Sequence, residues 1–295
     1  MQEKPKNLSD TRGNRFGIGF FLLCLRLFGP KFCCVFVWFV APFYALFDKQ
    51  AFEAAAPYLR SRFPNASPLK LRWHFCKMCV SQGQVMILAH WIRSGHHVNV
   101  LDINSQNAND LIQQAPNGFI LLLSHVGCWQ ATITRLENLE KPVHLLIQTN
   151  VNEAVVKLFK GRGISVISNE AAFGGLLDCM NALENNEIVC IMGDRMPPDA
   201  ENALHLTLHG RNVSIPAAPW LLAVRCHKPI FPVFTMMTGL AGGIDYIFEP
   251  KIELDYDLPR KPKPEQLQPL VKPYEDALNH LIDQYPYQIF HYQLH

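Results

Sequence analysis

The first residues able to do chemistry lie in the stretch LLLSHVGCWQ, residues 121–130, where His125 follows an apolar run and Gln130 stands five residues later. A histidine at the end of a buried strand can act as a general base, because its imidazole takes up a proton near neutral pH. Residue 130 falls on the first turn of the following helix, within reach of the imidazole N–H. A base of this kind usually leans on a carboxylate, whereas Gln130 is uncharged. The stretch therefore predicts a base acting on a substrate hydroxyl and raises the question of what orients it.

A second polar block, MGDR (residues 192–195), closes another apolar run. The forked donors of Arg195 suit an anionic or phosphorylated substrate, although Asp194 and Arg195 can also pair with one another. Further along, Gly210 permits a tight turn, and Pro216 or Pro219 can open the next helix. We expect Gly210 and Pro216 to contribute to substrate binding. The apolar segments after them either wall a channel for an acyl chain or pack as ordinary core.

Apolar runs and helical patterns alternate from residue 117 onward. Strands are predicted at 118–124, 143–149, 164–168, 187–193, 229–237 and 245–254, with helices at 129–140, 152–163, 171–186, 217–226 and 266–285, the last interrupted by Pro273. Residues 50–115 have a helical pattern, and 196–210 read as a loop. This rhythm predicts an α/β fold with a largely parallel central sheet flanked by helices. In such sheets chemistry lies beyond the carboxyl ends of the strands, so His125, Asp194 and Arg195 should converge on one crevice.

The N-terminal region is strongly apolar from residue 16 to residue 47, broken only by Arg26, the Gly29-Pro30 turn and Lys31. Neither half reaches the roughly 20 uninterrupted residues of a spanning helix. A bent or hairpin insertion, or a helix pair lying in the interface, fits better than a signal peptide, since no small-x-small cleavage site follows. A buried helical hairpin of a soluble core is the alternative. We predict a membrane-anchoring segment over 1–48 and a single α/β domain over 49–295.

Composition excludes other classes. A net charge of +2 on 295 residues, with no Lys/Arg run, gives no reason to expect nucleic acid. Nine scattered cysteines suit reduced thiols better than a disulfide framework. The pair Cys76 and Cys79 lacks the two further ligands that zinc requires, so buried thiols on a helix are the simpler interpretation. Cys128, three residues after His125, has no accompanying oxyanion motif that would favour a thiol nucleophile.

Taken together, residues 118–238 resemble the lipid A biosynthesis acyltransferase family, the lauroyl/myristoyl transferase branch of the lysophospholipid acyltransferase superfamily. The family's first block, a His, four residues and an acid, stands here as HVGCWQ, and its later block as MGDR. The run GRNVSIPAAPWLLAVRCHKPIFPVF, the N-terminal TRGNRFGIGFF and the C-terminal YPYQIFHYQ also fit its order of motifs. The resemblance thus extends over nearly the whole chain.

The resemblance implies transfer of a fatty acyl group from acyl carrier protein, or from CoA, to a hydroxyl of a membrane lipid or glycolipid, by default a lipid A precursor. It places the reaction at the cytoplasmic face of the inner membrane, without a metal or bound organic cofactor. His125 would be the general base and Gln130 would stand in the acid's place. Arg162 falls near a family arginine that meets the reacting carbonyl or a phosphate, and Asp194 and Arg195 would support substrate binding or site geometry.

The amide at position 130 departs from the family pattern. Glutamine can fix the tautomer of the histidine but cannot stabilise the imidazolium formed when the base takes a proton. Three interpretations stay open: Gln130 orients the base adequately, another carboxylate such as Asp194 supplies the charge, or the enzyme is slow or inactive. We favour the first two. The competing class is an acyltransferase-like lipid-binding protein with weak or no catalysis.

Overall fold

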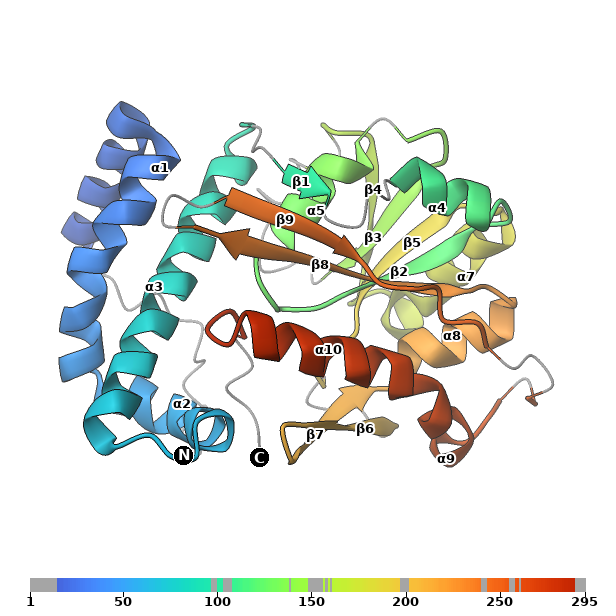
Figure 1. Ribbon diagram of the computed structural model, residues 1–295. Coiled ribbons are helices and arrows are strands. Elements are labelled where there is room, and N and C mark those ends of the chain that lie inside the picture. The colour runs from blue at the N-terminus through green and yellow to red at the C-terminus, as the bar shows by residue number, and fades with distance from the viewer. Residues whose placement is uncertain are drawn as a thin grey trace, which may run out of the picture.

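The computed structural model describes residues 15–96, 100–102, 108–137, 139–147, 156, 159, 161–196, 202–239, 243–254, 258–259 and 261–289. Within these residues the chain forms a 7-stranded sheet in the order β1-β9-β8-β2-β5-β3-β4 and a separate two-stranded hairpin, β6-β7. Helices pack on both faces of the larger sheet, and a long apolar helical segment lies at one side (Figure 1).

The centre of the sheet is parallel. It consists of β2 (Phe119–Leu123), β5 (Ile188–Met192), β3 (Val143–Ile147) and β4 (Ile164–Ser168), and β8 (Ile230–Thr238) runs parallel to β2 on its other side. Outside β8, β9 (Gly243–Phe248) is antiparallel to β8 and parallel to β1 (Val100–Asp102). The prediction of a largely parallel sheet is therefore confirmed. The strand expected over 245–254 ends at Phe248, because Pro250 has no N–H to continue a ladder.

The two faces of the sheet bury two separate cores. In β2, Ile120 and Leu122 point into a large core shared with the N-terminal helices, α8 and α10. Leu121 and its neighbours Phe119 and Leu123 point the other way, into a smaller core that also contains Leu111 of α4. Because alternate residues of a strand face opposite sides, a strand covered on both faces must be apolar throughout, as β2 is.

Most helices lie close to where the sequence pattern placed them. They are α2 (Lys49–Arg62), α3 (Pro68–Arg93), α4 (Ala108–Gln114), α5 (Gln130–Leu136), α7 (Leu176–Glu184, after the short η1, Ala172–Gly175) and α8 (Ala218–Cys226). The helix expected over 152–163 falls mostly outside the described residues. One prediction was wrong in detail, because the helical pattern over 50–115 contains the strand β1.

The predicted interruption at Pro273 is confirmed, because a new α-helix begins at Lys272 and Pro273 lies in its first turn. The C-terminal helical region divides into α9 (Pro264–Leu267), η2 (Gln268–Val271) and α10 (Lys272–Gln284). A proline in the first helical turn loses no hydrogen bond, since the N–H groups there have no intrahelical partner.

The segment 196–210, expected to be a loop, contains β6 (Ala203–Leu208), which pairs antiparallel with β7 (Arg211–Pro216). Its two turn residues, His209 and Gly210, both have positive φ (47° and 78°), as a tight type I′ hairpin turn requires. In β6 the residues alternate between buried and exposed, and this period-2 pattern was the missed signal. Side chains of the C-terminal helices cover the free edge of β6: Glu275 accepts from the Thr207 N–H and Asn279 donates to the Thr207 carbonyl.

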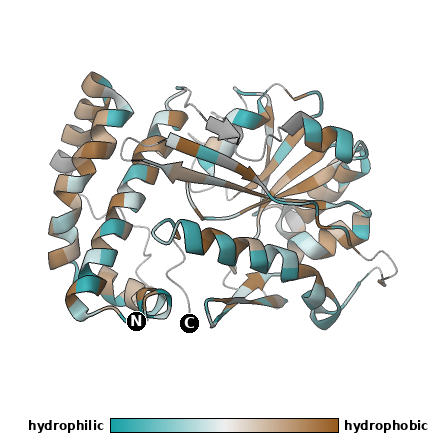
Figure 2. Ribbon diagram, in the orientation of Figure 1, coloured by the Kyte–Doolittle hydropathy of each residue, from teal (hydrophilic) through white to brown (hydrophobic). Residues whose placement is uncertain are grey.

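The apolar N-terminal segment is α1 (Arg15–Phe47), which doubles back at Gly29 (φ 77°, ψ 176°). The rings of Phe20 and Phe36 lie 6.4 Å apart, whereas a straight helix would separate residues so spaced by about 24 Å. The prediction of a bent or hairpin-like segment is thus confirmed, and both arms are visible beside α3 (Figure 1). Figure 2 shows that α1 is apolar along most of its length.

Candidate functional site

His125 stands two residues beyond the carboxyl end of β2, in a short loop before α5. Its side chain is 25% exposed, so the ring is supported by protein yet open to a substrate. The edge of Trp129 faces it, with ring centroids 6.5 Å apart and planes at 71°.

Asp194 reaches the same place from β5, the strand beside β2 in the sheet. Gly193 lies between strand and carboxylate, and its N–H donates to the Leu123 carbonyl at 2.9 Å. A Cβ at Gly193 would lie 2.3 Å from Leu122 Cδ1, so any larger residue would force the leucine side chain to shift. The buried strands and this glycine therefore bring together residues 69 positions apart in sequence.

The carboxylate of Asp194 binds His125 at two points. One oxygen accepts the backbone N–H of His125 at 2.6 Å, and the other lies 3.0 Å from ring nitrogen Nδ1. A carboxylate can only accept, so Nδ1 carries the proton and the lone pair of the neutral ring is on Nε2. The side chain of Asp194 is only 4% exposed, which keeps the pair away from competing water. The arrangement makes Nε2 a base whose imidazolium form would have a carboxylate beside it.

The loop that carries His125 is fixed by two distant segments. The N–H of Gly127 donates to the Gln288 carbonyl at 2.9 Å, and the N–H of Cys128 donates to the Thr235 carbonyl at 2.7 Å. The Thr235 hydroxyl donates back to the Cys128 carbonyl at 2.6 Å. Gly127 has φ 65°, and a Cβ at this position would lie 2.0 Å from the backbone carbonyl oxygen of Thr235. Gly127, Thr235 and Gln288 are site residues that sequence reasoning missed; the glycine inside HVGCWQ was the available signal.

Gln130 occupies the first position of α5 but points elsewhere. Its amide oxygen accepts from the Cys128 thiol at 3.7 Å, and among the described residues no hydrogen bond joins it to the His125 ring. Of the carboxylate and the amide, the structure therefore places Asp194 in contact with the base. The expectation that Gln130 reaches the imidazole finds no support in this geometry.

Behind Asp194 lies a second layer of buried hydroxyls. Tyr274 of α10 is fully buried, with its ring 5.7 Å from Trp220 and 6.1 Å from Phe234. Burial raises the pKa of Tyr274 well above its ordinary value; the Asp194 carboxylate raises it further, and the Ser124 hydroxyl partly offsets this. The tyrosine is consequently a neutral O–H group near the carboxylate, suited to donate and never to compete as an anion.

An apolar pocket of about 20 Å³ has Asp194 in its lining. It is closed by the β6-β7 hairpin, α10 and Tyr58 of α2; its other lining residues are Val126, Leu206, Leu208, Val213, Ile215, Leu278, Ile282 and Ile289. A space of this size holds no acyl chain without displacement of the hairpin. It does supply an apolar wall beside the carboxylate. Of the two alternatives for the apolar segments after Pro216, a channel wall or ordinary core, the buried side chains of Trp220 in α8 and Phe234 in β8 fit the core.

Cys128 is an inert thiol in this setting. It is fully buried, and burial raises its pKa to about 12, an effect that the neighbouring Cys34 of α1 adds to. Because the thiolate is the nucleophilic form, a thiol mechanism is disfavoured. Cys34 of α1 and Cys128 belong to the same buried apolar core, so the N-terminal helix and the His125 loop pack into one core.

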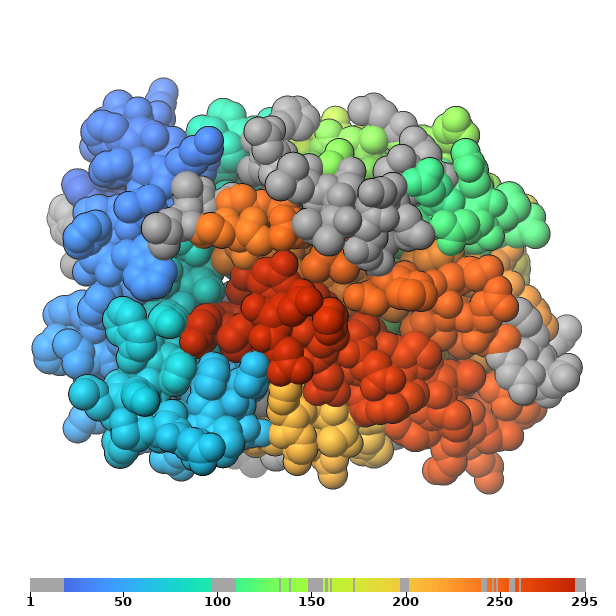
Figure 3. Space-filling view, in the orientation of Figure 1, coloured from blue at the N-terminus to red at the C-terminus, as the bar shows by residue number. Residues whose placement is uncertain are grey.

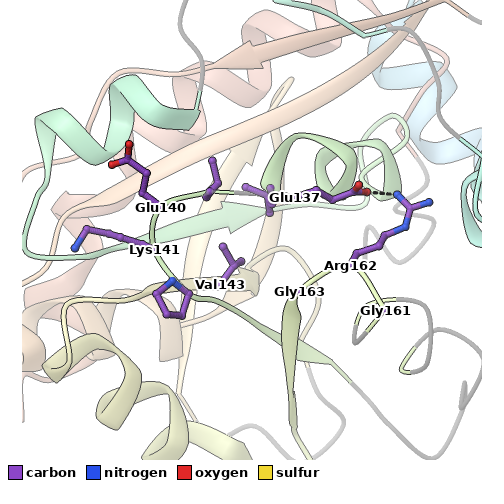
Figure 4. Close-up of a pocket in the computed structure, with 10 residues that line it drawn as sticks. Glu137, Glu140, Lys141, Val143, Gly161, Arg162 and Gly163 are labelled. Carbon is purple, nitrogen blue, oxygen red and sulfur yellow. Dashed lines mark hydrogen bonds and ion pairs between the residues drawn. The ribbon is translucent and has the colours of Figure 1, made fainter.

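Arg162 lies at the opposite edge of the sheet from His125. It directly precedes β4, so it stands at the amino ends of strands that run parallel to β2, where it pairs with Glu137 and donates to the Ile92 carbonyl at 3.1 Å (Figure 4). Its side chain is 9% exposed, in the wall of a cavity of about 570 Å³ that also includes Lys141. These contacts are those of a structural ion pair, and a role for Arg162 in substrate binding stays a prediction.

The remaining predicted residues are spread over two regions. Arg195 is exposed and follows Asp194 directly, beyond the carboxyl end of β5. Gly210 forms the hairpin turn and Pro216 ends β7, opposite Ala203. It is Pro219, not Pro216, that opens α8. Gly210 and Pro216 therefore shape the hairpin, and substrate contact by either stays a prediction.

Counted without regard to its turn, the stretch Gly19–Phe47 is long and apolar enough to cross a membrane. This property gives modest support for membrane association. No cluster of three or more His, Cys, Asp or Glu side chains suited to hold a metal ion occurs among the residues described.

A largely parallel sheet covered on both faces, with a histidine–carboxylate pair beyond its strand ends, is the architecture of α/β enzymes that place their chemistry at that edge of the sheet. The chain matches the family of bacterial lipid A biosynthesis acyltransferases over residues 3–262, nearly its whole length, and it belongs to that family. It is accordingly an acyltransferase of lipid A biosynthesis. No curated protein matches the sequence.

Proposed function

We propose that the chain moves a fatty acyl group from a thioester, on acyl carrier protein or CoA, to a hydroxyl of a membrane lipid or glycolipid, a lipid A precursor being the first choice. The observation that carries this proposal is the two-point contact between Asp194 and His125, which leaves Nε2 free as a base. Family membership supports the acyl transfer itself.

In the proposed reaction, His125 Nε2 takes the proton of the acceptor hydroxyl while the hydroxyl oxygen attacks the thioester carbonyl carbon. The resulting tetrahedral intermediate collapses, the C–S bond breaks, and the imidazolium returns its proton to the departing thiolate. Asp194 stabilises the imidazolium between these two transfers and holds the ring orientation. The step needs neither a metal nor a bound organic cofactor. Arg195, exposed beside Asp194, is placed to meet an anionic group of donor or acceptor.

The location proposed for this reaction is the cytoplasmic face of the inner membrane, with α1 as the anchor. The apolar length of α1 supports attachment, and its packing in the same buried core as Cys128 supports delivery of lipid to His125 from that side.

A second candidate, a lipid-binding protein with little or no catalysis, rested on the missing acid at position 130. The contact between Asp194 and His125 removes that reason, since a buried carboxylate already serves the base. We therefore favour the enzyme.

The direct test incubates full-length protein in detergent with radiolabelled acyl-carrier-protein thioesters of several chain lengths and with extracted membrane lipids. Label should enter a lipid and be released by mild alkali, which cleaves esters faster than amides. His125→Ala should abolish transfer, with Cys128→Ala as the matched control that retains it. No transfer for any chain length or acceptor would reject the enzyme, and alkali-stable product would reject a hydroxyl acceptor.

A further inference from the structure

The turn at Gly29 divides α1 into two arms that pack against each other, a first arm over residues 15–28 and a second arm over residues 30–47. At 1.5 Å per residue the arm before the turn is about 21 Å long and the arm after it about 27 Å, and both are shorter than the roughly 30 Å hydrocarbon core of a bilayer. The contact between Phe20 and Phe36 shows that the arms run antiparallel. The backbone of Gly19–Phe47 therefore does not form one continuous membrane span.

The second arm is attached to the α/β body along its whole length. Near its start the Gln84 amide donates to the Cys34 carbonyl at 3.2 Å, and near its end Arg72 donates to the Ala45 carbonyl at 2.9 Å. Between them, Val37 packs closely on Gly83: a Cβ added to Gly83 would lie 2.8 Å from Val37 Cγ1. The arm thus lies antiparallel on α3. It cannot enter a bilayer end-on without taking α3, with its lysines, histidines and glutamines, into hydrocarbon.

The face of α1 turned away from α3 is apolar and uncovered. Figure 3 shows α1 at the outer edge of the molecule, beside α2 and α3. In the second arm the exposed residues recur every three or four positions, and the large apolar side chains exposed along both arms are Phe20, Leu22, Leu23, Leu27, Phe28, Phe32, Val35, Phe39, Phe43, Leu46 and Phe47. Phe39, at the middle of the second arm, is 76% exposed. A soluble surface helix would be polar on this side, so the exposed stripe fits contact with lipid.

Both ends of this stripe carry cations. Arg26 and Lys31 are exposed beside the turn, and Lys49 is exposed just past the other end. Arg72 ties the first turns of α3 to that second end, and these turns present Leu69, 81% exposed, and Trp73, 51% exposed. The ammonium of Lys77 lies 5.6 Å from the Trp73 ring.

Tryptophan and lysine at the rim of an apolar surface are the groups that occupy the headgroup region of a membrane. If the hairpin inserted turn first, Arg26 and Lys31 would have to pass through the hydrocarbon.

We infer that α1 lies flat in one leaflet of an anionic membrane, with its outer stripe in the acyl region and with Lys31, Lys49 and the Leu69–Trp73 turn at headgroup level. The protein then attaches to one surface and spans nothing. The apolar residues rest on the boundary of the acyl region, about 5–10 Å deep, and the lysines meet lipid phosphates. This inference concerns only how the chain sits on a membrane, so it stands or falls independently of acyl transfer.

The first test uses Lys31→Cys and Lys49→Cys variants of the full chain bound to preformed, sealed vesicles that contain about one third phosphatidylglycerol. A membrane-impermeant maleimide is added outside, and the parent chain measures the background from its native cysteines. We expect equal labelling of both variants. Protection of Lys31→Cys, relieved by detergent, would show that the turn crosses the bilayer and would overturn the inference.

A depth measurement separates flat from turn-first insertion. A fluorophore on Phe28→Cys, Phe39→Cys or Phe43→Cys should be quenched equally by lipids brominated at a shallow position. Quenching that deepens steadily from residue 43 to residue 28 would contradict a flat hairpin. Absence of quenching in all three would show that the stripe does not meet lipid.

The third test concerns charge. Lys70→Glu should weaken binding to the anionic vesicles at least fivefold, since each lysine near such a surface contributes about that factor. Lys261→Glu, the same change on an exposed lysine three residues before α9, should have no effect. Equal losses in both variants would mean that only net charge matters and would reject the assigned rim.

Discussion

Asp194→Asn keeps the size of the side chain and changes only what it can accept. Two N–H groups of His125, the backbone donor at 2.6 Å and Nδ1 at 3.0 Å, point at the two carboxylate oxygens. An asparagine offers one oxygen and one NH₂ group, so one donor must face another donor. The ring relieves this clash by moving its proton to Nε2, and the base is then protonated on the atom that should accept.

The expected loss follows from that tautomer. When the aspartate of a serine-protease triad is replaced by asparagine, kcat falls by about 10⁴. At 1.36 kcal/mol per decade, this corresponds to about 5 kcal/mol of transition-state stabilisation. Asp194 is buried beside its histidine, as the aspartate of such a triad is. We therefore expect kcat to fall by about 10⁴, with KM little changed. The free energy of unfolding should fall by only about 1–3 kcal/mol, the range for one unmatched buried hydrogen bond.

The assay compares initial rates of acyl transfer by the parent chain, Asp194→Asn, Gln130→Ala and Gln130→Glu, with urea unfolding of each as the control for folding. Both Gln130 variants should stay within about tenfold of the parent, because the amide contacts the Cys128 thiol and not the imidazole. Combining Asp194→Asn with His125→Ala should add almost nothing to the loss from His125→Ala alone.

The reasoning would be refuted if Asp194→Asn retained more than a tenth of the parent rate while Gln130→Ala lost a thousandfold. The base would then be oriented from position 130. If Asp194→Asn loses activity because it is unfolded, the Asp194→Glu variant is measured in its place. This variant keeps the charge and should recover part of the rate.

Three further predictions concern other parts of the structure. Gly193→Ala should lower the free energy of unfolding by about 1–3 kcal/mol and also reduce kcat, because its Cβ would meet Leu122 at 2.3 Å and shift the next residue; unchanged urea midpoints and rates would show that the contact is not tight. Burial raises the pKa of Cys128 to about 12, so its thiol stays protonated at pH 8 and iodoacetamide should alkylate it about a thousandfold more slowly than an ordinary thiol, as mass spectrometry of native protein can measure. Arg162→Gln and Glu137→Gln should each destabilise by about 3 kcal/mol with KM unchanged, since the pair is largely buried; a raised KM in the arginine variant alone would show substrate contact.

Local pattern predicted much of this molecule because the relevant forces act over a few residues. The runs predicted as strands at 118–124, 164–168 and 187–193 each match an observed strand within a residue. The first and third are apolar because β2 and β5 are buried on both faces of the sheet. His125 at a strand end follows from the same pattern. The β6-β7 hairpin was missed although Leu204 and Leu206 alternate with polar residues, because the run was short and followed a proline-rich loop.

The partner of the base was decided by tertiary structure. Sequence spacing made Gln130 the near candidate and Asp194 one alternative among several. The sheet order places β5 directly beside β2 although β3 and β4 intervene in the chain, and no local pattern encodes that order. Gly193 then allows the two strand ends to approach, while the left-handed turn at Gly127, held by Thr235 and Gln288, carries the start of α5 away from the imidazole.

The sequence by itself determined the α/β class, the place of His125 at a strand end and the apolar character of residues 16–47, because composition and short-range periodicity are sufficient for each. Only the tertiary structure decided that Asp194 supplies the carboxylate, that Arg162 lies at the far edge of the sheet, and that α1 folds back on itself along α3. Each of these depends on which distant surfaces pack together, and that is set by the burial of the whole core.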